Sequence, residues 1–149
     1  MRTTFIFALC LLAYINTKAQ SNEIVGYWLT ADKTSQIRIF KATNGKYYGE
    51  ICWILEFAKY PNLDSHNPDP EKRNQSKLGL RLLNSFVYSA DDNNWNSGTI
   101  YDPDNGKTYD CFMWFEDDPN KLRIKGYVMG MHLLGRETTW IRESGLRKD

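Results

Sequence analysis

Residues 94–115 read NWNSGTIYDPDNGKTYDCFMWF, two runs rich in aromatic and β-branched residues separated by a short polar segment. Asp102-Pro103 ends the first run, because proline cannot donate to a strand ladder. Asn105-Gly106 is the dipeptide that best accepts positive φ in a tight turn. The stretch therefore predicts a β-hairpin and favours an all-β chain.

The same alternation of apolar runs and turn residues continues on both sides of this hairpin. Predicted strands cover residues 25–30, 35–40, 46–57, 80–89, 94–101, 107–115, 121–128 and 134–142. Period-two alternation is clear in the second run, where Ile37 and Ile39 are expected to face the core and Gln36 the solvent. About eight successive antiparallel strands predict an up-and-down barrel, with a β-sandwich as the alternative.

The N-terminal residues, MRTTFIFALCLLAYINTKAQ, have the pattern of a secretory signal peptide. Arg2 precedes an apolar run that is too short to span a bilayer, and Thr17-Lys18-Ala19 provides a small-residue cleavage site. Residues 1–19 are therefore expected to be a signal peptide, and residues 20–149 a single domain. We expect that domain to be periplasmic or secreted, without a membrane span.

The charge balance argues against binding to nucleic acid. The chain has 19 Lys and Arg against 18 Asp and Glu, and cleavage would remove Arg2 and Lys18 but no acid. A nearly neutral domain lacks the basic footprint of proteins that bind nucleic acid or anionic membranes. We expect a monomer.

No metal site, cofactor site or catalytic motif is predicted. An EF-hand loop starting at Asp102 would need ligands where Gly106 and Met113 stand. The histidines and cysteines lack the spacing of a zinc site, and no Gly-x-Ser-x-Gly motif is present. Cys52 and Cys111 fall in apolar strands on opposite sides of the predicted barrel, so both are expected to be free, buried thiols.

One connection is far longer than the others. Residues 58–79, AKYPNLDSHNPDPEKRNQSKLG, are polar and rich in proline. Loops longer than about 12–15 residues are often lids or binding loops. The barrel's aromatic side chains either fill the interior or line a narrow pocket that opens toward this loop. The predicted ligand-binding residues are Trp53, Asp64, Asn67, Arg73, Trp95, Asp102 and Tyr109.

Binding of a small or hydrophobic molecule without catalysis is the favoured function. Asp102 and Tyr109 are also expected to fasten the long loop over the barrel mouth. One alternative is an envelope hydrolase acting on a glycan or acyl group, with Asp64, His66 and Arg73 in the catalytic loop. The other is a protein-interaction module, which would need a large exposed apolar patch.

The two ends of the domain carry a pattern of their own. Gly26 and Trp28 open the first predicted strand, and Arg142 closes the last. Because these strands are neighbours in a barrel, we expect the guanidinium to stack on the indole. This combination resembles the calycin superfamily of lipocalins, fatty-acid-binding proteins and avidins. The resemblance implies a lipocalin-like barrel in which these three residues are structural.

A second resemblance spans most of the domain. The segments GYWLT, YYGEICWI, WNSGTIYDPDNGKTY, LRIKGYV and LLGRETTWIR occur in the order typical of the exported bacterial domain-of-unknown-function family 2147. This resemblance implies a bacterial envelope or secreted location, a small barrel and no established activity. It adds Gly135 and Trp140 to the residues expected to be structural, together with Gly106 of the hairpin. Met129 to His132 depart from the family pattern, which has smaller residues there.

Overall fold

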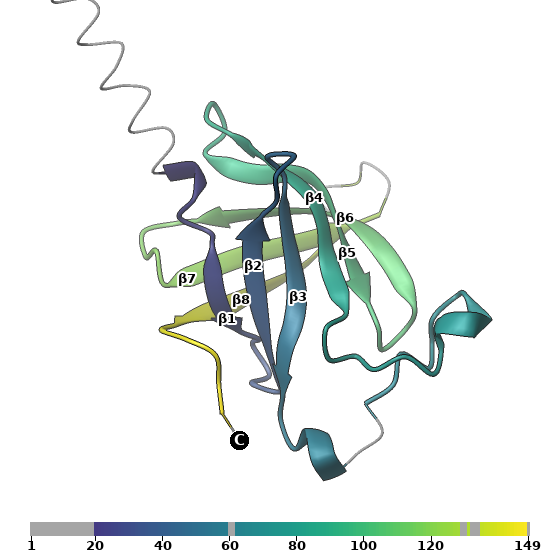
Figure 1. The fold of residues 1–149 in the computed structure, drawn as a ribbon. Coiled ribbons are helices and arrows are strands. Elements are labelled where there is room, and N and C mark those ends of the chain that lie inside the picture. The colour runs from purple at the N-terminus through teal and green to yellow at the C-terminus, as the bar shows by residue number, and fades with distance from the viewer. Residues whose placement is uncertain (1–19, 60–61, 129–130, 132–134, 149) are drawn as a thin grey trace, which may run out of the picture.

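Eight antiparallel strands in sequence order close into a barrel, with the first strand paired to the last (Figure 1). This computed structural model describes residues 20–148, except 60–61, 129–130 and 132–134. The strands are β1 (Gly26–Leu29), β2 (Ser35–Lys41), β3 (Tyr47–Ile54), β4 (Arg81–Ser89), β5 (Asn94–Asp102), β6 (Lys107–Phe115), β7 (Lys121–Tyr127) and β8 (Arg136–Glu143). The up-and-down barrel is confirmed, and the alternative sandwich does not form. The predicted signal peptide and the segment from Met129 to His132 lie outside the described residues, apart from Met131.

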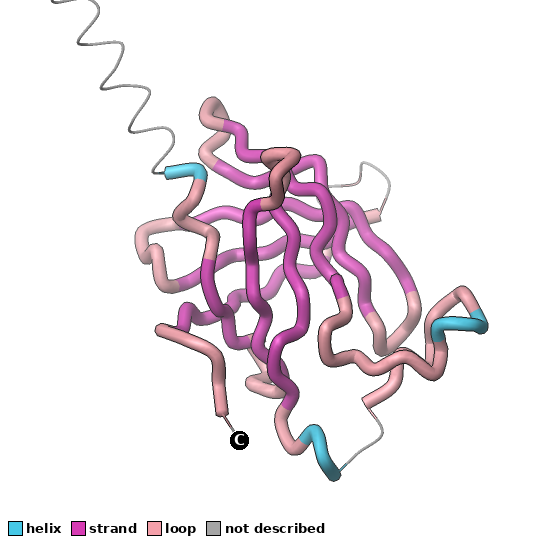
Figure 2. The backbone as a smooth tube through the Cα atoms, viewed as in Figure 1, coloured by secondary structure: helices cyan, strands magenta, loops and turns pink. Residues whose placement is uncertain are grey.

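In the part of the chain that the structure describes, helix is confined to short turns at the periphery (Figure 2). The two 3-10 helices are η1 (Phe57–Lys59) and η2 (Pro70–Lys72), both within or beside the long connection. The prediction of a strand from 46 to 57 was too long: β3 ends at Ile54, and Glu56 takes a φ of 53°, in the left-handed region and not in the β region. The hairpin between β5 and β6 is confirmed, with Asp102 paired to Lys107 and Gly106 at a φ of 71°.

Aromatic rings fill one end of the barrel, which we call the closed end. Trp28, Tyr47 and Trp95 are buried there, and Trp95 contacts the rings of Tyr88 and Phe115 at 5.0 and 5.5 Å between centroids. Packing of this kind is stabilising because each ring buries a large apolar area. The interior is therefore solid at this end.

Residues 20–25 cover the closed end and satisfy the polar atoms of its rings. The indole Nε1 of Trp95 donates to the carbonyl of Ser21, and that of Trp28 donates to the carbonyl of Ile24. The hydroxyl of Tyr47 donates to the side chain of Asn22. Buried donors without partners would each cost about 1–3 kcal/mol, so this segment is part of the fold.

The expected stack of Arg142 on Trp28 is confirmed. The two residues are cross-strand partners, and the guanidinium carbon lies 4.2 Å from the centre of the indole. Arg142 also donates to the carbonyls of Glu23, Val25 and Pro119, which joins three segments of chain. Gly26 is needed beside it, because its φ is 143° and a Cβ there would lie 3.2 Å from Nη1 of Arg142.

The C-terminal residues 144–148 cross the outside of β2 and β3. Gln36 was expected to face solvent but is 0% exposed, because this segment covers it. Its amide nitrogen donates to the carbonyl of Gly145, and its amide oxygen accepts from the backbone nitrogen of Arg147. The guanidinium of Arg147 lies 5.0 Å from the ring centre of Trp53. The tail therefore buries part of the outer wall.

Cys52 and Cys111 are both free, as predicted. Cys111 is buried, and burial raises the pKa of its thiol to about 12. Cys52 is only partly buried, on the outer wall, and donates to the backbone carbonyl of Gln36. Burial raises the pKa of the Cys52 thiol to about 11. Neither thiol ionises at neutral pH, so both are poor nucleophiles.

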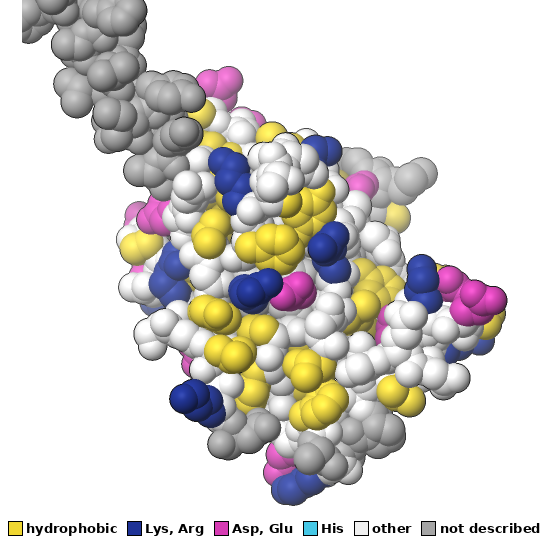
Figure 3. Space-filling view, viewed as in Figure 1, with side chains coloured by type: hydrophobic (Ala, Val, Ile, Leu, Met, Phe, Trp, Pro, Cys, Tyr) yellow, Lys and Arg dark blue, Asp and Glu magenta, His cyan; other side chains and the backbone are white. Residues whose placement is uncertain are grey.

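The outer face of β2, β3 and β4 mixes hydrophobic and charged side chains (Figure 3). Phe40 stacks on Tyr48, and Arg38 of β2 forms an ion pair at 2.8 Å with its cross-strand partner Glu50 of β3. Arg81 lies over the ring of Tyr48. Charged groups therefore interrupt the apolar surface on this face.

Candidate functional site

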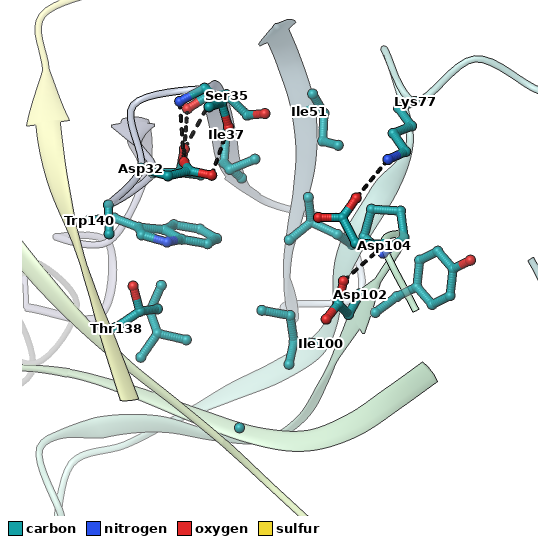
Figure 4. A pocket seen from close by; sticks show the side chains of 18 of the residues that line it. Asp32, Ser35, Ile37, Ile51, Lys77, Ile100, Asp102, Asp104, Thr138 and Trp140 are labelled. Carbon is teal, nitrogen blue, oxygen red and sulfur yellow. Dashed lines mark hydrogen bonds and ion pairs between the residues drawn. The ribbon is translucent and has the colours of Figure 1, made fainter. Parts of the chain in front are cut away.

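The end of the barrel opposite the aromatic rings contains a cavity of about 780 Å³ (Figure 4). Its floor consists of side chains from six strands, with Ile37, Ile51, Leu82, Ile100, Ile124 and Trp140 among them. Pockets for small molecules have volumes of about 300–1,000 Å³ and are mostly apolar. The barrel is therefore hollow at one end and solid at the other.

The distribution of residue sizes along the strands explains this asymmetry. At the mouth end, the inward positions of β7 and β8 carry Ile124 opposite Thr138 and Gly126 opposite Arg136. A Cβ at Gly126 would lie 3.4 Å from Ile100, so a side chain there would occupy the wall of the cavity. Apart from Trp140, the floor residues named above are aliphatic, and together with Gly126 and Thr138 they leave space that rings occupy at the closed end.

The loop between β1 and β2 forms one edge of the mouth through Asp32. Its carboxylate accepts hydrogen bonds from the hydroxyl groups of Thr30 and Thr34, at 2.6 and 2.8 Å. Burial raises the pKa of Asp32, but the hydrogen bonds from Thr30 and Thr34 outweigh it and hold the pKa below its ordinary value. Asp32 is therefore a fixed, ionised group at the cavity edge.

The hairpin turn between β5 and β6 forms another edge. Asp102 lines the cavity and accepts hydrogen bonds from the backbone of Asp104 and the side chain of Asn105, which hold the turn. Asn105 also donates to the hydroxyl of Tyr109. Asp104 forms an ion pair at 2.8 Å with Lys77 of the long loop (Figure 4). The cavity therefore opens toward the long loop, as expected.

The long loop is fastened to β5 by a buried carboxylate. Asp64 is 1% exposed and accepts hydrogen bonds from the Tyr101 hydroxyl at 2.7 Å and the Asn67 amide at 2.6 Å. Burial, together with the hydrogen bond and the charge of Asp64, raises the pKa of Tyr101 to about 12. Tyr101 is therefore a neutral donor at physiological pH, and it positions the loop.

A close backbone contact fastens the same loop a second time. A Cβ at Gly106 would lie 1.9 Å from the carbonyl oxygen of His66, so only glycine lets the loop rest against the hairpin. The loop was expected to be held by Asp102 and Tyr109. Their hydrogen bonds instead stabilise the hairpin turn, and Tyr101, Asp104 and Gly106 make the contacts to the loop.

The structure separates the seven predicted ligand-binding residues. Asp102 and Tyr109 line the cavity. Trp95 belongs to the closed end, and Trp53 lies on the outer wall under Arg147. The remaining three, Asp64, Asn67 and Arg73, are not among the lining residues: Asp64 bonds to Tyr101 and Asn67, and Arg73 donates to the carbonyl of Asn67.

The predicted structural residues occupy tight positions. Gly26, Trp28 and Arg142 meet at the closed end, and Gly106 lies against the long loop. A Cβ at Gly135 would lie 2.5 Å from the carbonyl oxygen of Gly126. Trp140 is 5% exposed and contributes to the core, but it also lines the cavity.

Sequence reasoning missed several residues of the cavity. Asp32, Lys77 and Arg136 line the mouth, and Ile37 and Ile100 line the floor. Period-two alternation marks Ile37 as inward-facing, but it does not show which inward positions lie at the hollow end. Asp32 and Lys77 belong to loops, whose conformation alternation does not predict.

The three residues of the hydrolase alternative do not converge on the cavity. The two carboxylate oxygens of Asp64 bond to Tyr101 and Asn67, and Arg73 donates to the carbonyl of Asn67. Within the described ranges, no group of three His, Cys, Asp or Glu side chains is placed to hold a metal ion. In that same part of the chain, no helix has the length and apolarity required to cross a membrane.

Replacing Asp64 with alanine is expected to lower the free energy of unfolding by about 1–3 kcal/mol, because the Tyr101 hydroxyl and the Asn67 amide lose a buried acceptor. The exposed Glu71 of the same loop is the control, and Glu71→Ala should change stability by less than about 0.5 kcal/mol. Urea denaturation followed by circular dichroism measures both. Equal losses would show that Asp64 does not anchor the loop.

Two comparisons with known proteins gave a match. A sequence family described as "Uncharacterized protein conserved in bacteria (DUF2147)" matches residues 26–142. Among solved structures, the chain is similar to protein HP1028 from the human pathogen Helicobacter pylori, which is described as belonging to the lipocalin family. The TM-score is 0.69 and the identity 24%, over 81% of this chain and 83% of that one. No curated protein sequence matches. The structural match shows a lipocalin-like fold.

Proposed function

The chain belongs to the DUF2147 family of bacterial proteins, and from this premise we propose that it is an exported protein that binds a small, largely apolar molecule without catalysis. The observation that carries the proposal is the cavity of about 780 Å³, which has an aliphatic floor and one polar mouth. Transfer of apolar surface from water into such a space releases about 25 cal/mol per Å² buried.

The closed end supports a binding role, because the packed rings block that end of the barrel and leave the mouth for a ligand to enter. Trp28, Trp95 and Phe115 pack against one another below the cavity, and residues 20–25 cover them. A ligand that enters at the mouth would therefore be enclosed on all sides but one. The fixed positions of the strand residues fit a pre-formed site that needs little rearrangement.

The position of the covering segment supports export as part of the proposal. Ser21 and Ile24 accept the two indole hydrogen bonds of the closed end, and both follow the predicted cleavage site after Ala19. Cleavage at that site would leave every one of these contacts in place. N-terminal sequencing of protein recovered from the periplasm or medium tests the assignment, which fails if the protein remains cytoplasmic and uncleaved.

Binding can be tested with a neutral, environment-sensitive naphthylamine dye. The dye should bind in a single site, and its fluorescence should increase on binding. It should also quench the fluorescence of Trp140, the tryptophan among the cavity-lining residues. Thr138 faces the cavity, so Thr138→Trp should fill the space and weaken binding by about tenfold or more, or roughly 1.4 kcal/mol.

Thr139→Trp is the matched control for this experiment. Thr139 is the next residue of β8 and faces the other side of the sheet, where it pairs with Arg123. We expect this variant to bind the dye within about twofold of the natural protein, since its side chain lies outside the barrel. Absence of dye binding by the natural protein, or equal loss in both variants, would refute binding in the cavity.

A further inference from the structure

The charged groups at the mouth are unequally matched. The acids that line it are Asp32, Glu56, Asp102 and Asp104, and the bases are Lys77 and Arg136. Lys77 is paired with Asp104 at 2.8 Å, and Glu56 is paired with Lys59 at 2.6 Å. Among the described residues, Asp32 and Asp102 have no ion-pair partner. Of the two bases, Lys77 is paired and Arg136 is not. The mouth therefore has an excess of negative charge.

Asp32 is the acid best placed to meet a bound molecule. Its carboxylate, like that of Asp102, accepts hydrogen bonds within its own turn. The hydroxyl groups of Thr30 and Thr34 and the backbone nitrogen of Thr34 donate to it and fix it at the cavity edge. The lowered pKa of Asp32 keeps it ionised at neutral pH. What distinguishes Asp32 from Asp102 is the aromatic ring that lies beside it.

Trp140 lies at the same edge of the cavity as Asp32. Leu29 pairs with Ile141 across β1 and β8, which brings the loop that starts at Thr30 alongside Trp140. Figure 4 shows the indole of Trp140 extending into the cavity on the side of Asp32, with Ile37, Ile51 and Ile100 around the remaining space. An ionised carboxylate and an aromatic ring thus lie together at the top of an apolar floor.

From this juxtaposition we propose that the ligand is an amphiphile with a cationic head group, such as an alkylammonium, bound by Asp32 and Trp140. The proposal rests on the proposed function and names the class of its ligand. The aliphatic tail packs on the isoleucines of the floor. Aromatic rings attract quaternary ammonium groups, and a carboxylate within a few ångströms adds Coulomb attraction that the partly exposed mouth screens only in part.

A matched series of decyl compounds tests the charge of the head group. Decyltrimethylammonium, decanol and decanoate share one tail and are used below their micelle concentrations to displace the neutral naphthylamine dye. We expect decyltrimethylammonium to bind about tenfold more tightly than decanoate, with decanol between them. High salt should reduce this preference, because it screens the carboxylate.

Variants locate the origin of the preference. Asp32→Asn should reduce the ratio of the affinity for decyltrimethylammonium to that for decanoate to about threefold or less. Asp91→Asn removes the same charge from the exposed turn at the closed end and should leave the ratio unchanged. Because the ratio and its salt dependence are first measured on the natural protein, the test holds even if a variant folds poorly.

Each outcome separates the two proposals. If no compound of the series and no dye binds, the proposed function fails. If decanol binds as tightly as decyltrimethylammonium, the barrel binds apolar molecules without regard to head-group charge, and the cationic class is overturned. If decanoate binds as tightly, that class is also overturned, and Arg136 becomes the anchor for an anionic head group. If Asp91→Asn lowers the affinity ratio as much as Asp32→Asn does, the preference for the cation comes from the net charge of the protein and not from Asp32. That result also overturns the proposal.

Discussion

Replacing Trp28 with alanine is expected to lower the free energy of unfolding by about 3–5 kcal/mol, the cost of truncating a fully buried large ring. Trp28 is 0% exposed, contacts the ring of Phe115 at 5.9 Å between centroids and donates to the carbonyl of Ile24. The change would leave a cavity at the closed end and one carbonyl without its donor. Urea denaturation followed by far-ultraviolet circular dichroism measures the loss without relying on tryptophan fluorescence.

Trp114→Ala is the control for this prediction, because it makes the same chemical change on the outside of β6. Trp114 is partly exposed and stacks on Phe112 at 5.1 Å. Its truncation removes less buried surface and leaves no enclosed cavity, so we expect less than half the loss seen at Trp28. Similar losses at the two positions would contradict the assignment of the closed end as the main core.

Replacing Arg142 with alanine should cost about 2–4 kcal/mol. The guanidinium donates to three carbonyls and covers the indole of Trp28, and hydrogen bonds from charged donors contribute more than neutral ones. Removing it leaves the carbonyls of Glu23, Val25 and Pro119 without that donor. Arg142→Lys keeps the charge but not the planar fork, so it should restore less than half of the lost stability.

A double-mutant cycle separates the stack from the hydrogen bonds of Arg142. If the stack contributes, Trp28→Ala and Arg142→Ala together should cost less than the sum of the single changes, by about 0.5–2 kcal/mol. Additive losses would show that Arg142 acts through the three carbonyls alone. The measurement is the same urea denaturation, applied to the natural protein, both single variants and the double variant.

Local patterns predicted most of the barrel. Turn dipeptides such as Asn105-Gly106 fix where strands end, and period-two alternation fixes which side chains share a face. The contact between Trp28 and Arg142 followed from topology, because sequential strands that close a barrel make the first and last neighbours. These inferences needed only information that is local in sequence, plus the single assumption of closure.

Trp53 shows where such reasoning stops. Strict alternation along β3 places Trp53 on the same face as Tyr47 and Ile51. The register shifts between Gln36 and Ile37, so that Ile51 pairs with Ile37 but Trp53 pairs with Gln36. A one-residue shift moves a side chain to the opposite face of a sheet, and Trp53 is therefore outside the barrel. No residue type in the sequence marks this bulge.

The cavity depended on information that is not local. Whether inward-facing residues fill a barrel depends on which of them lie at the same height, and this is set by the register of all eight pairs. Asp64 was correctly singled out in the long loop, yet its role as an anchor required knowing that Tyr101 lies beside it. Loop conformation is decided by such contacts rather than by the loop's own sequence.

The pairing of β1 with β8 has a consequence for how the chain folds. Leu29 and Ile141 are partners, although they lie near opposite ends of the domain. Pairings that are this distant in sequence form slowly, because the entropy of closing a long loop must be overcome before the contact is gained. Until β8 joins, the sheet has two unpaired edges that can recruit other chains. We therefore expect the β1–β8 pairing to form last, and we expect the protein to be most prone to aggregate before it forms.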